Sequence, residues 1–177
     1  MQDMNEIAIW PGSNYFLRTG LKFIAQSCLD VDIRKGYIFV DFSAPNLRFF
    51  TNSEWINTLR TTSMRIVLIC DSIMEPLAEY WRLREKRIYT AIYTDYNITK
   101  IVEMLTLSAF FSRMDATRRI NRLDKKEVFH IDLSLQGLSP SEMSQVLNLP
   151  VKKIYNIKQG INRKLRKDIE RIMFSQL

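Results

Sequence analysis

The sequence predicts an α/β domain with an open, doubly wound parallel sheet, followed by a small all-α domain. Up to about residue 112, short runs rich in Ile, Val, Tyr and Phe alternate with longer amphipathic stretches, a pattern typical of parallel strands joined by helices. Residues 113–177 have no strand pattern, and they hold fourteen Lys and Arg against seven Asp and Glu. Residues 1–112 hold twelve of each, so the net charge of +7 lies wholly in the last third of the chain.

Four strands and four helices are expected in the first domain. The strands are short and rich in β-branched and aromatic residues, and they are expected at residues 6–10, 36–42, 65–70 and 87–93. A weaker strand is expected at residues 29–34. The intervening stretches have helical length and period, and they predict helices at residues 13–27, 51–62, 73–85 and 97–111. Strands and helices in alternation predict a sheet covered by helices on both faces.

The last third is expected to be helical after a polar, basic linker. We place the first domain at residues 1–111, the linker at 112–122 and the helical domain at 123–177. The first helix of this domain is expected over about residues 124–136, and Gly137 ends it, because Gly is the preferred residue just past a helix C-terminus.

A helix, a short turn and a second helix follow. The second helix of the domain starts with a capping pattern and runs to about Leu147; the pattern consists of Ser139, Pro140 and Glu142. A third helix is expected over about residues 151–166, and a last one over about residues 168–176. Two helices joined by a short turn can read DNA when the second has a polar outer face.

The third helix of this domain has such a face. At 100° per residue, its apolar residues form one stripe that must pack inward: Ile154, Ile157, Ile161 and Leu165. The opposite side carries Lys152, Tyr155, Asn156, Gln159, Arg163 and Arg166. Lys and Arg neutralise phosphates, while Asn and Gln match the edge of adenine, so double-stranded DNA is the expected partner. The plainer interpretation, a solvated helix face, has the regional excess of positive charge against it.

Gly160 lies inside this helix, where Gly costs about 1 kcal/mol relative to Ala. Two interpretations stay open. The glycine either makes the helix less rigid, or it lets the backbone approach a phosphate closely.

Other classes of protein are disfavoured. Cys28 and Cys70 are far apart in apolar contexts, as expected of buried thiols rather than a disulfide framework or a metal cluster. His130 is the only His and lies in an apolar helical run, which favours a structural imidazole, so we expect no enzyme, no cofactor and no metal site. The start of the chain lacks a secretion signal, and no run reaches the length of a membrane span, which indicates a cytosolic protein.

Residues 123–165 resemble the DNA-binding domain of LuxR-type (NarL/FixJ-like) bacterial transcription regulators. The resemblance rests on Glu127, Gln136-Gly137-Leu138-Ser139, Glu142, Gln145, Leu147, Lys152, Asn156, Ile161 and Arg163-Lys164-Leu165. It implies a four-helix domain with a helix-turn-helix, and the DNA-binding candidates are Lys152, Lys153, Tyr155, Asn156, Gln159, Arg163 and Lys164. Two positions depart from the family: Pro150 replaces a capping Ser or Thr, and Lys153 replaces a Thr. Pro150 is expected to weaken the start of the recognition helix.

The front part is similar to the receiver domain that many of these regulators carry. "YFLRTGL" resembles the first receiver helix, and "YIFVDFSAP" resembles the strand and loop that bear the phosphoacceptor, which implies that Asp41 occupies that position. A receiver also needs an acidic pair, a Thr or Ser, and a Lys; these positions hold Gly12-Ser13, Cys70 and Thr94. An isolated carboxylate binds Mg²⁺ too weakly to offset the charge of an incoming phosphoryl group. We therefore expect a degenerate receiver that phosphorylation does not control.

The leading hypothesis is a DNA-binding transcription regulator of the bacterial cytoplasm and nucleoid, controlled by its abundance or by pairing. The first alternative is an auxiliary protein that acts mainly by forming a heterodimer with another LuxR-type regulator. The second is a phosphorylation-driven response regulator.

A dimer, with itself or with another LuxR-type regulator, is expected because one recognition helix covers too few base pairs to be selective. The resemblance implies pairing through the last helix, where Ile169, Ile172 and Met173 share one side, although these residues could equally complete the small helical core. A second pairing surface is considered around Trp81 and Tyr89, because exposed Tyr and Trp can anchor a partner. The default expectation is that the aromatic residues of this region belong to the core; they are Tyr80, Trp81, Tyr89, Tyr93 and Tyr96.

Overall fold

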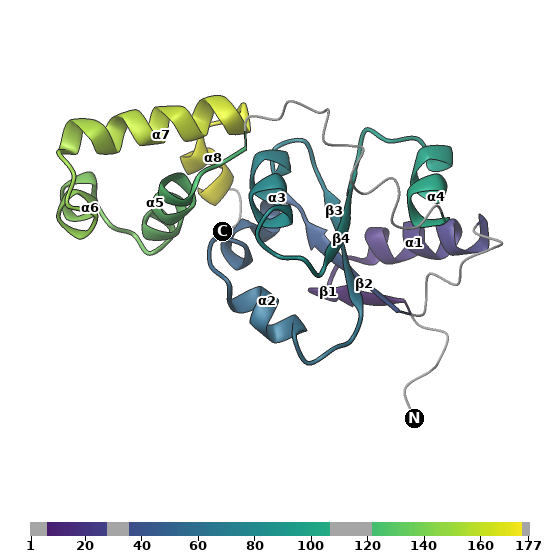
Figure 1. Ribbon diagram of the computed structural model, residues 1–177. Coiled ribbons are helices and arrows are strands. Elements are labelled where there is room, and N and C mark those ends of the chain that lie inside the picture. The colour runs from purple at the N-terminus through teal and green to yellow at the C-terminus, as the bar shows by residue number, and fades with distance from the viewer. Residues whose placement is uncertain (1–6, 28–35, 107–121, 175–177) are drawn as a thin grey trace.

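The computed structural model describes residues 7–27, 36–106 and 122–174 of the chain (Figure 1). Its centre is a sheet of four parallel strands in the order β1-β2-β3-β4. Their bounds are Ala8–Trp10 for β1, Tyr37–Phe42 for β2, Arg65–Cys70 for β3 and Ile88–Tyr93 for β4. All three strand pairs are parallel, so the predicted parallel sheet is confirmed. The predictions of a strand at residues 29–34 and of a linker at 112–122 fall almost entirely outside the described residues.

Helices cover both faces of this sheet, as predicted. Helices α1 (Tyr15–Ser27) and α4 (Ile98–Thr106) pack on one face. The other face is covered by the 3-10 helix η1 (Ala44–Phe49) and by α2 (Glu54–Leu59) and α3 (Glu75–Arg82). Strand β2 shows why the sheet needs both layers, because its six residues are all buried and its five apolar side chains are divided between the two apolar clusters.

Helix α2 is shorter than the expected 51–62. The chain tightens after Leu59: the N–H of Arg60 donates to the carbonyl of Asn57, and that of Thr62 donates to the carbonyl of Leu59. The guanidinium of Arg87 donates to the carbonyls of Leu59 (2.7 Å) and Thr62 (3.0 Å). Arg87 thus satisfies carbonyls at and just beyond the C-terminal end of α2, which have no partner within the helix.

The last part of the chain forms four helices: α5 (Lys125–Leu135), α6 (Pro140–Leu147), α7 (Val151–Leu165) and α8 (Ile169–Phe174). The predicted capping box of α6 is confirmed, because the Ser139 N–H donates to Glu142 (2.7 Å) and the Glu142 N–H donates to the Ser139 hydroxyl (3.3 Å). These bonds hold the pKa of Glu142 below its ordinary value. The predicted stop after α5 is confirmed by Gly137, whose φ is +83°.

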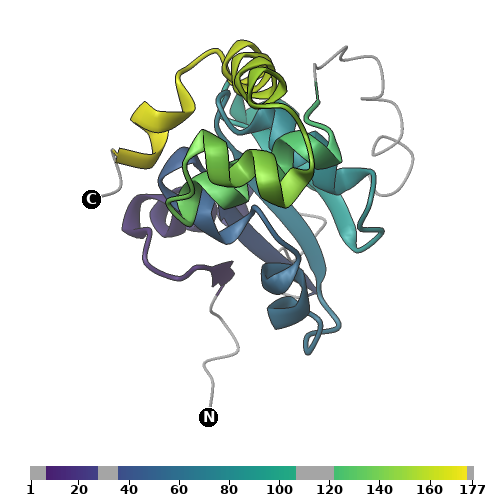
Figure 2. The same cartoon turned by 90° about the vertical axis from the view of Figure 1, so that its left-hand side faces the viewer.

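The four C-terminal helices lie against the front part of the chain, next to α3 and η1 (Figures 1 and 2). One apolar cluster contains core residues from both parts, among them Trp55, Leu77, Ile131 and Ile161. Polar contacts add to it: the hydroxyl of Thr51 donates to Asp132 (2.6 Å), and the Leu123 N–H donates to the Pro76 carbonyl (3.1 Å). The division into two domains stays a prediction, and the two parts share a continuous core.

Both surfaces considered for pairing are largely buried. Ile169 and Ile172 are each 1% exposed, Met173 packs against the same cluster, and α8 contacts η1. The last helix therefore completes the core, and the expectation that it presents Ile172 to a partner is wrong in this arrangement. Trp81 is also buried and donates its indole N–H to the Phe50 carbonyl (2.7 Å), so it cannot anchor a partner. Tyr89 is half-buried against Tyr37 and Arg65.

None of the described helices is long and apolar enough to cross a membrane.

Two glycines should respond oppositely to substitution by Ala. Gly137→Ala should lower the free energy of unfolding by about 1–2 kcal/mol, because its left-handed backbone disfavours a Cβ. Gly20→Ala should raise it by about 0.5–1 kcal/mol, because Gly20 lies within α1 and a Cβ there would meet no atom within 4 Å. Urea denaturation measures both, and equal effects of the same sign would contradict this account.

Candidate nucleic-acid interface

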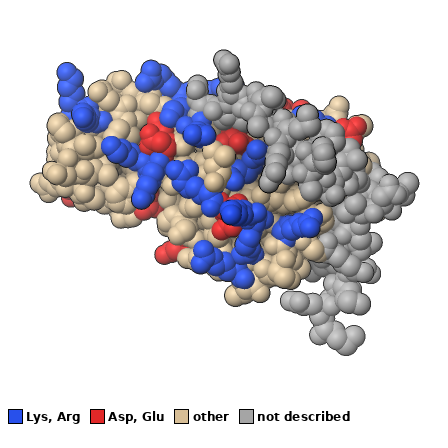
Figure 3. All heavy atoms as spheres, viewed as in Figure 1, with Lys and Arg blue, Asp and Glu red and all other residues tan. Residues whose placement is uncertain are grey.

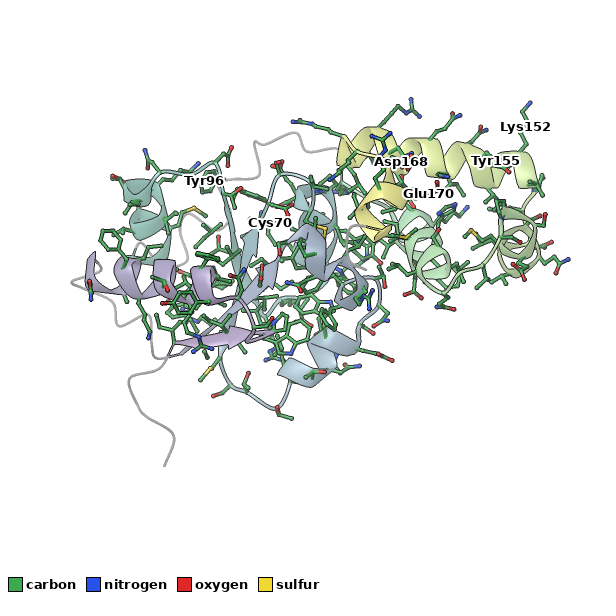
Figure 4. The ribbon with its side chains drawn as sticks, turned by 180° about the vertical axis from the view of Figure 1, so that it is seen from behind. Cys70, Tyr96, Lys152, Tyr155, Asp168 and Glu170 are labelled. Carbon is green, nitrogen blue, oxygen red and sulfur yellow. The ribbon has the colours of Figure 1, made fainter. Side chains whose placement is uncertain are left out.

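The outward face of α7 is polar, basic and open to solvent. Its exposed side chains include those predicted from the helical period: Lys152, Tyr155, Asn156, Gln159, Arg163 and the C-cap residue Arg166. Lys153 is also exposed. Figure 4 shows Lys152 projecting from the start of α7, away from the body of the molecule. The exposure of this face is confirmed, while its contact with DNA stays a prediction.

The opposite face of α7 explains why the polar face points outward. Ile154, Ile161 and Leu165 are at most 1% exposed, and Ile157 is partly buried. These residues pack against α5 and α6, and Ile161 and Leu165 also belong to the core shared with the front part. Burial of one apolar stripe therefore sets the rotation of α7 about its axis.

The turn between α6 and α7 is held by local bonds. Asn148 ends α6 with a left-handed backbone (φ 50°), which Asn adopts more readily than most residues. The hydroxyl of Ser144 donates to the Leu149 carbonyl (2.6 Å), and the Leu149 N–H donates to the Ser144 carbonyl (3.0 Å). Pro150 is the N-cap residue of α7 and, as expected, supplies no side-chain acceptor. The start of α7 therefore depends on the Pro150 carbonyl and on the turn.

A groove of about 700 Å³ lies between α7 and the start of α5. Four of the predicted DNA-binding residues line it: Lys153, Asn156, Arg163 and Lys164. Lys126 adds a further cation from α5, where Asp124 and Glu127 also contribute to the lining. Figure 3 shows that Lys and Arg gather over this end of the molecule and continue across the same face of the front part.

Lys164 differs from the other predicted residues because it has a partner within the chain. Its ammonium group donates to Glu127 Oε2 (2.6 Å), and Glu127 is only 7% exposed. The same carboxylate oxygen accepts the N–H of Asp124 (2.7 Å), which completes a capping box at the start of α5. Lys164 thus neutralises a buried carboxylate, and its assignment as a free phosphate contact is corrected.

The structure favours a packing role for Gly160. A Cβ at this position would lie 3.3 Å from Glu127 Oε1, tighter than an ordinary contact. Because Glu127 is held by Asp124 and Lys164, it has little room to move. Gly160 therefore lets α5 approach α7 closely.

His130 has a structural environment, as the sequence indicates. The ring is 3% exposed, and burial, followed by the charge of Lys158, lowers its pKa below the ordinary value. The Ser134 hydroxyl lies 3.4 Å from Nδ1 and donates to the His130 carbonyl. Lys158 forms an ion pair with Glu170 of α8, so it links α7 to α8 instead of joining the outward face.

Asp41 lies at the carboxyl end of β2 and is 6% exposed. Its Oδ2 accepts a hydrogen bond from the side-chain amide of Asn14 (2.9 Å), while Asn14 Oδ1 accepts the Leu17 N–H at the start of α1 (3.0 Å). The nearby Asp71 accepts backbone N–H groups, including those of Ala44 (2.7 Å) and Met74 (2.9 Å). The sequence predictions do not include this role of Asn14, although an Asn just before an amphipathic helix is a capping signal.

Within the described part of the chain, no three His, Cys, Asp or Glu residues are grouped so that they could hold a metal ion. Cys70, at the carboxyl end of β3, is buried, and this burial is the main reason why its pKa is raised well above the ordinary value. The Asp41 site is thus composed of carboxylates that bind amide and backbone donors.

The fold and this site define a protein with a receiver-like α/β sheet, whose second strand carries a hydrogen-bonded Asp near its carboxyl end, and with four helices after the sheet. The family model described as the EcpR N-terminal domain matches residues 2–109. The chain is 33% identical over 158 residues to the uncharacterized protein YqeH of Escherichia coli K12, covering 89% of this chain and 74% of that protein. The chain therefore belongs to the family of proteins with an EcpR N-terminal domain.

Two similar solved structures contain RcsB. The RcsB response regulator of Salmonella typhimurium, in a structure described by its conformational dynamism for DNA interaction, is 16% identical, with 98% of both chains covered and a TM-score of 0.45. A structure of two RcsB dimers bound to two parallel DNAs is also 16% identical, with 89% of this chain and 80% of that chain covered and a TM-score of 0.42.

Substitutions of two adjacent cations of α7 should show which of them stabilises the fold and which is only a surface charge. Lys164→Met should lower the free energy of unfolding by about 1–3 kcal/mol, because it leaves the buried carboxylate of Glu127 without its cation. Arg163→Met should change it by less than about 0.5 kcal/mol, because Arg163 is exposed. Thermal and urea unfolding test this difference, and equal losses in the two variants would show that Lys164 is not structural.

Proposed function

We propose that the chain is a DNA-binding regulator of transcription whose helices α5–α8 form a LuxR-type helix-turn-helix domain, with α7 as the recognition helix. The observation that carries this proposal is the outward face of α7, where exposed Lys, Arg, Asn and Gln lie opposite a largely buried apolar stripe. The EcpR N-terminal domain model matches residues 2–109, so the helices proposed to bind DNA lie outside the matched region.

The residues of this face have distinct roles. Lys152, Lys153 and Arg163 contact phosphates, because they are exposed cations at the start of α7 and along its groove. Asn156 and Gln159 read base edges, because their amides offer a donor and an acceptor from the centre of the face. Tyr155, which is 51% exposed, packs against the sugar-phosphate backbone. Lys164 supports α7 through Glu127.

Regulation is independent of phosphorylation. In the front part, Asp41 accepts a hydrogen bond from the neutral amide of Asn14, and Gly12 and Ser13 supply no carboxylate that could join Asp41 in holding Mg²⁺. The described residues offer no metal-binding group of His, Cys, Asp and Glu. Control therefore comes from the amount of the protein or from pairing, and a dimer supplies the two recognition helices that a selective site requires.

Lys152→Ala and Asn156→Ala should weaken DNA binding in different ways. Lys152→Ala should weaken binding to every sequence similarly and lower the slope of log K against log salt by about one. Asn156→Ala should cost about 1–3 kcal/mol, mainly on a cognate site selected from random DNA. Binding titrations at several salt concentrations measure both effects.

Val146→Ala serves as a control in these titrations, because Val146 is 54% exposed on α6 and carries no charge. Binding that does not depend on salt, or that survives both substitutions, would contradict the proposed interface. A chain that protects DNA only when a second LuxR-type regulator is added would favour the auxiliary function instead.

Acetyl phosphate with Mg²⁺ should neither label the protein nor change its DNA binding. Asp41→Asn should leave DNA binding unchanged, because an amide in that position still fits beside Asn14 after rotation of its side chain. Intact-mass measurement after incubation tests the labelling. A stoichiometric gain of one phosphoryl group that disappears in Asp41→Asn would reverse this part of the proposal.

A further inference from the structure

A band of positive charge continues from the α7 groove onto the front part of the chain. Its C-terminal half consists of Arg122, just before α5, and of Lys125 and Lys126 at the start of α5. Its other half consists of Arg84 and Lys86 in the loop between α3 and β4, which lies on the side turned to the viewer in Figure 1. All five side chains are exposed. We call them the basic band, and Figure 3 shows Lys and Arg spread across both parts of the molecule on this side.

Contacts within the chain hold Arg84 in place on this surface. The centre of its guanidinium lies 3.8 Å from the centre of the Tyr80 ring, and the guanidinium donates to the Tyr80 carbonyl (3.2 Å). Tyr80 is 7% exposed, so the stack rests on the core of the front part. A guanidinium stacked on an aromatic ring still has N–H donors in its plane that can bind the oxygens of a phosphate.

The acidic side chains that neighbour Arg84 and Lys86 in the sequence have other partners. Glu79 forms an ion pair with Arg82 (3.2 Å) and accepts the hydroxyl of Tyr93 (2.6 Å). Glu85 accepts the N–H of Arg87 (2.9 Å). The two carboxylates at the start of α5 are likewise engaged, because they form its capping box. Within the part of the chain that the structure describes, no carboxylate forms an ion pair with a cation of the basic band.

The shared core fixes the two halves of the basic band relative to each other. Helix α3 packs against α7, and the Leu123 N–H donates to the Pro76 carbonyl at the start of α3 (3.1 Å). Arg122 directly precedes Leu123, so it lies beside that end of α3. A duplex bound to the outward face of α7 would therefore meet the front part in one defined position.

We propose that the front part of the chain is itself a DNA-binding surface, in which Arg84 and Lys86 contact the phosphates of the duplex that α7 reads. The inference rests on the proposed function, because the duplex at α7 is the one that reaches the basic band. Double-stranded DNA fits this surface because it carries about one negative charge for every 1.7 Å of its axis, so its phosphates can follow the band beyond α7. Contacts to phosphates position the protein and carry no sequence information of their own.

The test compares two double variants that each lose two positive charges. Arg84→Gln/Lys86→Gln removes the front half of the basic band. The matched control is Lys100→Gln/Lys22→Gln, on α4 and α1, which cover the other face of the sheet. Lys100 lies over the Tyr96 ring (3.7 Å), as Arg84 lies over Tyr80, and Lys22 is exposed like Lys86. Far-UV circular dichroism should show both variants folded.

The band variant should bind every DNA sequence more weakly than the unaltered chain does. The slope of log K against log salt should fall by about two, because each lost phosphate contact lowers it by about 0.9. Hydroxyl-radical footprinting should show a shorter protected stretch of backbone on a selected site. The control variant should keep the full footprint and nearly the full slope, because its charges lie away from the duplex.

Equal slopes and footprints for the band variant and its control would overturn the inference. If Lys152→Ala still weakened binding in that case, the proposed function would stand without it. An unaltered chain that does not bind DNA would overturn both. A band variant that bound DNA normally but lost binding to phosphatidylglycerol vesicles would identify the basic band as a membrane contact instead.

Discussion

One continuous apolar core holds the sheet and the C-terminal helices together, and the placement of α7 depends on it. The core includes the packed aromatic rings of the front part, such as Trp55 and Trp81, whose centroids are 5.7 Å apart. It continues into Ile161 on α7 and Ile172 on α8. Because these side chains interlock at the density of a protein interior, α7 cannot rotate about its axis without opening the core. Its polar face is thereby held toward solvent.

A smaller polar network refines this placement. Glu127 caps α5, accepts the ammonium of Lys164 and occupies the space that Gly160 leaves open. One carboxylate therefore ties the start of α5 to the middle and end of α7. A buried carboxylate is costly without partners, so the network is stable only when the two helices are correctly placed. It makes the distance between them specific, whereas apolar packing alone would tolerate small shifts.

The sequence was informative where local rules decide the structure. The alternation of strands and helices, the glycine after α5 and the capping box of α6 follow from short-range patterns, and the rotation of α7 follows from its period. The errors concern long-range burial. Ile169 and Ile172 share one side of a short helix, a pattern that suits a partner surface as well as a core. Lys164 resembles its neighbour Arg163 in the sequence, and only the approach of Glu127 from α5 distinguishes them.

The shared core also has a consequence for how such a protein can evolve. Many multidomain proteins exchange their domains by recombination, because each domain closes its own core and its linker carries few contacts. Here the removal of either part would open the shared cluster, to which Leu77 belongs on one side and Leu123 and Ile131 on the other. A foreign helical domain joined at the same point would have to reproduce the shape of that contact. The two parts are therefore constrained to diverge together, by paired substitutions across the contact, more than by reshuffling.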